Sequence, residues 1–236
     1  MSDATIRLLD NLNALACGLF LLTAFGIVAT RQARACLHLF ILQSLLLAAS
    51  ALLLGIRFDS AHLYGVALVN LITKPVIVPW LLHKTSPAEI YTRREISQVL
   101  NIPTALLIAM ALAVLAYFLG SPLARAVGPE ASGQNVPIGI AGLLLGAFTL
   151  SVRREAMSLL IGLLAMENGA FLAGISIARD LTMLIELAIA TDGLIIVFIM
   201  GVLVRAVEKH VGTTAIGELS DLREAAAKPA ADEVLL

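Results

Sequence analysis

Charged side chains are scarce in this chain, and neither sign dominates. They make up 14% of the 236 residues, and the formal net charge is −1. Soluble domains carry about 25% charged residues, so this composition excludes an ordinary soluble surface. The near-neutral balance provides no basic field for nucleic acid and no polybasic cluster for anionic lipid headgroups. We therefore expect no nucleic-acid partner.

Cysteine is equally scarce, with two residues, Cys17 and Cys36, in apolar stretches. They form no CxxC or Cys/His pattern, so the spacing indicates neither a disulfide framework nor a nickel or iron–sulfur site. We expect both thiols to pack as small hydrophobic groups. His38 and His62 lack a second ligand at metal spacing, and we interpret both as interfacial packing residues. We expect no cofactor and no metal site.

Apolar residues make up most of the chain. The chain is 59% hydrophobic, with a mean hydropathy of +0.94. A helix needs about 20 apolar residues to span a bilayer. Leu and Ala dominate, and no strand-like alternation is present, so we predict an all-α, polytopic membrane protein. Its N-terminus has no basic region before a cleavage site, so we expect the first span to be retained. The seven predicted spans are approximately 8–29, 35–56, 61–82, 102–120, 136–152, 156–178 and 181–206.

Loop composition predicts the organisation of these spans. The connection 84–101 favours an interfacial helix that begins at Pro87, and the Gly-, Pro- and Ser-rich stretch 121–137 favours an external loop. Most of the 16 Lys and Arg residues fall on one predicted side, which places the N-terminus outside and the C-terminus in the cytoplasm. We predict four parts: a four-helix block (1–120), the loop (121–137), a three-helix block (138–207) and a cytoplasmic tail (208–236).

Three ionisable residues lie near the centres of predicted spans: Lys74, Glu167 and Asp192. Each lies roughly 16–20 Å into its span at 1.5 Å per residue, so all three share one depth. A charge at that depth costs roughly 2.5–3.5 kcal/mol on insertion scales and commonly belongs to a proton relay. A structural salt bridge between helices is the alternative. Glu186 lies shallower, and we interpret it either as an entry or exit group or as a hydrated rim residue.

Two prolines follow the buried lysine closely. Pro75 and Pro79 each remove a backbone hydrogen bond, so we predict a helix break that helps to solvate Lys74. The last two predicted spans are joined by very few residues, which makes them antiparallel neighbours. We therefore expect Glu167 and Asp192 to approach each other and share a proton. The remaining intramembrane polar residues more commonly join helices by hydrogen bonds: Ser158, Thr149, Asn168 and Thr191.

The C-terminal part, about 136–225, resembles the K subunit of respiratory complex I and its relative in multisubunit cation/proton antiporters. In that family a basic pair precedes an LIGLE-type run with a following asparagine, and a later helix carries a carboxylate. Here Arg153-Arg154, the run LIGLLAMEN that ends at Asn168, and Asp192 correspond to these features. Where the family has its glutamate this chain has Leu164, and the acid Glu167 follows one helical turn later.

The longer chain with four preceding helices and a MENG sequence resembles the hydrogenase-4 component E family. This resemblance implies a non-catalytic membrane subunit of a group 4 hydrogenase or formate hydrogenlyase complex in the bacterial or archaeal inner membrane. It implies antiporter-like large membrane subunits, a quinone-subunit homologue and a peripheral [NiFe] hydrogenase arm as partners. Redox chemistry would then belong to those partners.

Two functional hypotheses follow. In the first, Lys74, Glu167 and Asp192, with Glu186 at the periphery, carry part of a proton path. In the second, the protein is a scaffold between antiporter-like subunits, in a hydrogenase or an antiporter complex, and its buried charges only hold helices together. A free-standing transporter fits less well, because the chain has no internal repeat and few polar groups for a solute.

Overall fold

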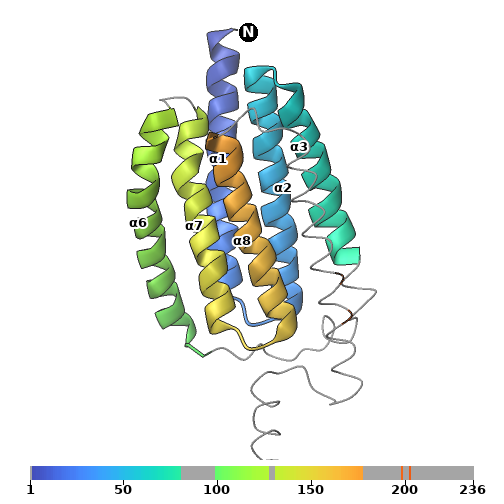
Figure 1. Ribbon diagram of the computed structural model, residues 1–236, viewed down its shortest axis with the longest axis vertical. Helices are drawn as coiled ribbons and strands as arrows, with labels where there is room; N and C mark the ends of the chain where they lie inside the picture. The colour runs from blue at the N-terminus through green and yellow to red at the C-terminus, as the bar shows by residue number, and fades with distance from the viewer. Residues whose placement is uncertain (1, 81–98, 128–130, 178–197, 199–201, 203–236) are drawn as a thin grey trace, which may run out of the picture.

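The fold is a bundle of long, roughly parallel and antiparallel helices (Figure 1). The computed structural model describes residues 2–80, 99–127, 131–177, 198 and 202. Its elements are α1 (Asp3–Ala29), α2 (Ala33–Phe58), α3 (Ala61–Ile72), the π-helix η1 (Thr73–Ile77), α6 (Ile102–Val127), α7 (Ala131–Val152) and α8 (Ala156–Ile177).

Local sequence signals define the first helix ends. The Ser2 side chain accepts a hydrogen bond from the backbone N–H of Thr5 and so caps α1. Helix α2 ends at Asp59, whose left-handed backbone (φ 52°) terminates the helix and turns the chain toward α3. Because both connections are a few residues long, α1, α2 and α3 form consecutive antiparallel hairpins.

Four helices form the centre of the bundle. α1 packs on α2, α2 on α8, α8 on α7, and α7 on α1, so that each contacts two of the others. α6 and α3 flank this group on opposite sides (Figure 1). Phe20 of α1, Leu47 of α2 and Leu172 of α8 are fully buried in one apolar cluster between these helices. Helices of both predicted blocks therefore share one core.

Glycines allow α7 and α8 to pack at very close range. A Cβ atom added at Gly139 would overlap the backbone of Ala173, and one added at Gly146 would overlap that of Met166. Gly169 is placed in the same way against the backbone of Leu143. Small residues of this kind drive helix association in membranes, where apolar packing against lipid provides little difference in free energy.

Two predicted irregularities are wrong in detail. The stretch 121–137 is not a loop throughout, because α6 continues to Val127 and α7 begins at Ala131, with 128–130 outside the described residues. Gly, Pro and Ser are tolerated there because a helix satisfies its own backbone groups in an apolar medium. At Pro75 the helix does not break but widens into η1, and the span then continues through Pro79 to Trp80. The wider hydrogen-bond pattern of a π-helical turn accommodates proline, which has no backbone N–H to donate.

Within the described residues, six helices are long and apolar enough to cross a membrane. They correspond to the first six predicted spans. The seventh predicted span (181–206), the interfacial helix after Pro87 and the tail (208–236) lie outside the described residues. The all-α membrane fold is confirmed.

Candidate functional site

A buried ion pair joins α8 to the π-helical part of the third span. The Lys74 Nζ atom lies 2.9 Å from Glu167 Oε1. Lys74 lies in η1, about 20 Å along the span that begins at Ala61, and Glu167 lies near the middle of α8. The two residues predicted to share one depth are therefore in direct contact.

The two members of the pair differ in exposure. The Lys74 side chain is 3% exposed, whereas that of Glu167 is 21% exposed. The ammonium also lies 5.5 Å from the centre of the Phe171 ring, in reach of a cation–π attraction. A buried ammonium needs such partners, because removing its hydration shell is costly.

An amide network extends from the lysine to α2. Lys74 Nζ donates to Asn168 Oδ1 at 2.8 Å, and Asn168 Nδ2 donates to Ser44 Oγ at 3.0 Å and to Gln43 Oε1 at 3.3 Å. Asn168, Gln43 and Ser44 are fully buried. Because an ammonium can only donate, Lys74 fixes the orientation of the Asn168 amide, and that amide in turn fixes Gln43.

One atom of this network has no partner among the described residues. With its oxygen facing Asn168, Gln43 leaves its Nε2 amide group buried and without an acceptor. A buried donor without an acceptor costs about 1–3 kcal/mol, so this position requires an acceptor such as water.

The other predicted site residues divide into two groups. Asp192, Glu186 and Thr191 lie outside the described residues, and their place in the site stays a prediction. Thr149 and Ser158 donate to backbone carbonyls three or four residues earlier, so these two hydrogen bonds are local and do not join helices. Both cysteines are free and buried, as predicted. The part of the chain that the structure describes contains no His, Cys, Asp and Glu group suited to a metal ion.

Gln43 and Ser44 are site residues that sequence reasoning missed. The signal was a polar pair in the middle of an otherwise apolar predicted span, 35–56. Neither residue is ionisable, and a sequence alone does not indicate which helix lies opposite them.

Comparison with curated proteins gives matches along most of the chain. An uncharacterized protein of Mycobacterium tuberculosis is 29% identical over 224 residues, which cover 95% of this chain and 100% of that protein. Hydrogenase-4 component E of Escherichia coli K12 and that of Shigella flexneri are each 29% identical over 216 residues, with 87% of this chain and 94% of each relative covered. Over most of its length the chain is similar to the hydrogenase-4 component E proteins, and these matches support that family. No family model and no solved structure matches it.

The similarity to Hydrogenase-4 component E and the six apolar helices together support a multi-pass protein of the bacterial inner membrane. The predicted resemblance and location are thus confirmed. The more specific resemblance of 136–225 to the complex I K subunit stays a prediction.

Arg153, half of the basic pair noted in the sequence, anchors the turn between α7 and α8 in this hydrogenase-4 component E relative. Its Nη2 atom donates to the carbonyl oxygens of Ile27 and Thr30 at 2.6 Å and of Val28 at 3.4 Å. These carbonyls end α1, where a cation is favoured by the helix dipole. Burial lowers the pKa of the Arg153 guanidinium, and nearby Cys36 and Glu155 oppose that shift.

Proposed function

We propose that this chain is a non-catalytic, integral membrane subunit of a hydrogenase complex. The relatives named Hydrogenase-4 component E and the six membrane-length helices support this role. By the same resemblance, its partners would be antiporter-like membrane subunits, a quinone-subunit homologue and a peripheral [NiFe] hydrogenase arm.

The contribution of the subunit is a proton-translocation path through the Lys74–Glu167 pair. The observation that carries this proposal is the 2.9 Å contact between an ammonium and a carboxylate in the middle of the membrane-length helices. When a proton reaches Glu167, the carboxylate becomes neutral and the attraction that holds the Lys74 proton is lost. The two charges therefore depend on each other, and a charge moved in a neighbouring subunit acts on both through its electric field. Asp192, with Glu186 at the periphery, supplies the next predicted station.

A scaffold role is the second candidate. The same network joins α2, η1 and α8, which suits groups that only hold helices together. In that case the protein would link antiporter-like subunits and move no proton itself.

A free-standing solute transporter finds less support. A cavity of about 440 Å³ between α2 and α3 is lined by leucines, alanines and Tyr64, and it offers almost no polar surface for a solute.

The experiment that separates path from scaffold is Glu167→Gln in the assembled complex. The amide keeps the size of the side chain but is neither protonated nor deprotonated at neutral pH, so it cannot relay a proton as a carboxylate can. General acid–base steps contribute about 10²–10⁴-fold to rates, so proton-coupled turnover should fall at least about tenfold. Native gels should still show the complete complex. The matched control is Glu155→Gln in the turn between α7 and α8, which should leave coupling unchanged. Normal coupling in Glu167→Gln, or loss of the complex itself, would contradict the path.

A further inference from the structure

Polar residues form a stripe along one side of α2, where Ser50 and Arg57 contact α1 and Gln43 contacts Asn168 of α8. Gln43, Ser50 and Arg57 recur every seven residues, which returns to nearly the same helix face about 10 Å further along. Helix α1 contributes polar groups opposite them. We call this contact the α1–α2 seam, which comprises Asp10, Asn13, Cys17, Gln43, Ser50, Arg57 and, from α7, Asn135.

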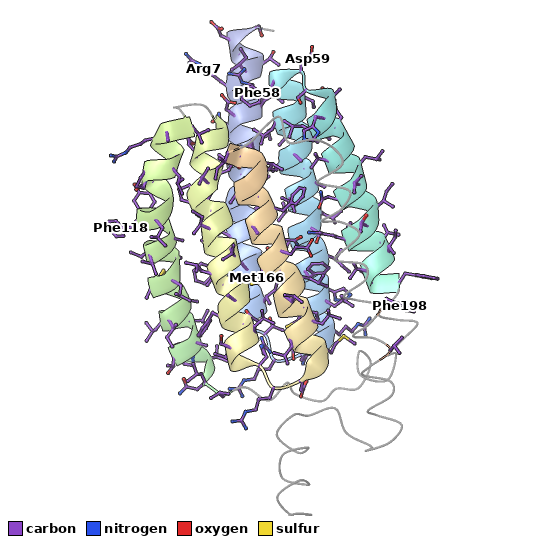
Figure 2. The ribbon with its side chains drawn as sticks, viewed as in Figure 1. Arg7, Phe58, Asp59, Phe118, Met166 and Phe198 are labelled. Carbon is purple, nitrogen blue, oxygen red and sulfur yellow. The ribbon has the colours of Figure 1, made fainter. Side chains whose placement is uncertain are left out.

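The seam begins at the end of the bundle where α1 starts and α2 ends. Figure 2 labels Arg7, Phe58 and Asp59 at this end. There Arg57 Nε lies 3.3 Å from Asp10 Oδ1, and the two side chains are 25% and 34% exposed. These charges form a rim that water reaches.

A fully buried polar cluster follows one turn deeper. Ser50 Oγ donates to Asn13 Oδ1 at 2.7 Å, and Asn13 Nδ2 donates to Asn135 Oδ1 at 3.2 Å. The Cys17 thiol lies 3.5 Å from Ser50 Oγ. Three helices thus place hydroxyl, amide and thiol groups at a depth where apolar side chains are the rule.

The inner end of the seam is the Nε2 group of Gln43, which has no acceptor among the residues that the structure describes. The Gln43 oxygen accepts from Asn168, which Lys74 orients, so this N–H donor is the far end of the network that starts at the ion pair. An N–H donor needs an acceptor with a lone pair and repels a metal cation. Water supplies such a lone pair, so water fits this position.

Two apolar side chains lie between the inner and outer polar groups. Phe20 follows Asn13 by seven residues on α1, and Leu47 lies between Gln43 and Ser50 on α2. Both are buried, and Cys17 belongs to the same apolar cluster. Within the described residues, a buried ring and a buried isobutyl group thus separate the inner and outer polar groups, and they leave room only for a thin file of water in the path proposed below.

We propose that the α1–α2 seam is a water-occupied access path by which solvent protons reach the Lys74–Glu167 pair from the Asp10–Arg57 end. This inference rests on the proposed proton function of that pair. A hydronium ion in the path gives its proton to the Glu167 carboxylate and remains as water, so no other reactant is needed.

The outer half is tested with the native Cys17 thiol as a reporter. The full chain carrying Cys36→Ala is placed in lipid nanodiscs and transferred to D2O, and the S–H stretching band is followed by infrared spectroscopy. The matched control combines Cys17→Ala, Cys36→Ala and Leu145→Cys, because Leu145 is equally buried in an apolar cluster outside the seam. The Cys17 thiol should exchange at least about tenfold faster than the control thiol. Equal rates would overturn the path.

The inner half is tested in the complex with Gln43→Leu, which keeps the volume and removes the donor. Coupled turnover should fall several-fold. The control Thr149→Val keeps the volume and removes a buried hydroxyl outside the network, so it should retain normal coupling. Ser50→Val serves as a second seam variant if Gln43→Leu does not assemble. If the seam variants keep full coupling while Glu167→Gln loses it, the access path through the seam is refuted but the proton function of the Lys74–Glu167 pair is not. Full coupling in Glu167→Gln would refute the proposed function, whatever the thiol exchange shows.

Discussion

In the Lys74–Glu167 pair, each charge would be strongly unfavourable in apolar surroundings without the other. Desolvation penalises each charge by several kcal/mol, and the attraction at 2.9 Å, with Asn168 as a further acceptor for the ammonium, offsets that penalty. The balance depends on both partners, because either one alone is an uncompensated buried charge. Pairs of this kind contribute less to stability than their short distance suggests.

Replacing one member of the pair should therefore destabilise the protein far more than replacing both. Lys74→Met alone should lower the free energy of unfolding by about 3–5 kcal/mol, because Glu167 loses its counter-ion. The double variant Lys74→Met/Glu167→Met should regain most of that stability, since well-packed apolar pairs replace buried ion pairs at little cost. Thermal unfolding of the chain in detergent measures both values.

Coupling in the complex supplies the second readout for these variants. If Lys74 and Glu167 carry protons, the double variant should be stable, but its turnover should no longer be coupled to proton movement. Restored stability with restored coupling would show that the charges only hold the helices together.

The helices themselves could be predicted from the sequence to a large extent. Apolar runs of membrane length located all six described spans, because a bilayer leaves the backbone of such a run few alternatives to a helix. The ends were less predictable. Ser121 and Gly133 favour a loop by local preference, yet both lie in helices, since intrahelical hydrogen bonds outweigh side-chain preference in apolar surroundings.

Close approach of α7 and α8 depends on glycine. Gly169→Ala should destabilise the protein by about 1–3 kcal/mol, because the new methyl group meets the backbone of Leu143 and Gly142, which cannot move aside independently. Gly174→Ala on the same helix is the matched control, because no atom lies within 4 Å of its added Cβ. Thermal unfolding should show a lower midpoint for the first variant only. Equal midpoints would mean that the two helices are packed more loosely than described.

At the scale of the whole molecule, the site was only half predictable. Lys74 and Glu167 were identified because buried charges are rare in an apolar sequence. Their contact, and the contribution of Gln43 and Ser44, depend on η1, α8 and α2 meeting at one place, which no pattern in those helices specifies. Neutral amides and hydroxyls of this kind are common in membrane helices as helix contacts, so type alone does not identify them as part of a site.

The orientation of the bundle follows from where the basic residues gather. The fold brings Arg31 and Arg34, before and at the start of α2, to the same end as Arg153 and Arg154, because Arg153 binds the carbonyls at the end of α1. The positive-inside rule predicts that this end is cytoplasmic and that the Asp10–Arg57 rim is external. The seam would then open toward the outside of the cell.

Reporter fusions test this orientation. Alkaline phosphatase, which is active only outside the cytoplasm, should be active when fused after Asp59, in the turn from α2 to α3. It should be inactive when fused after Arg154, in the turn from α7 to α8, and a fluorescent protein that folds only in the cytoplasm should give the opposite pattern. The reverse result would turn the Asp10–Arg57 rim toward the cytoplasm. The same water path would then supply the Lys74–Glu167 pair with protons from inside the cell, so the direction of proton uptake at this subunit depends on this measurement.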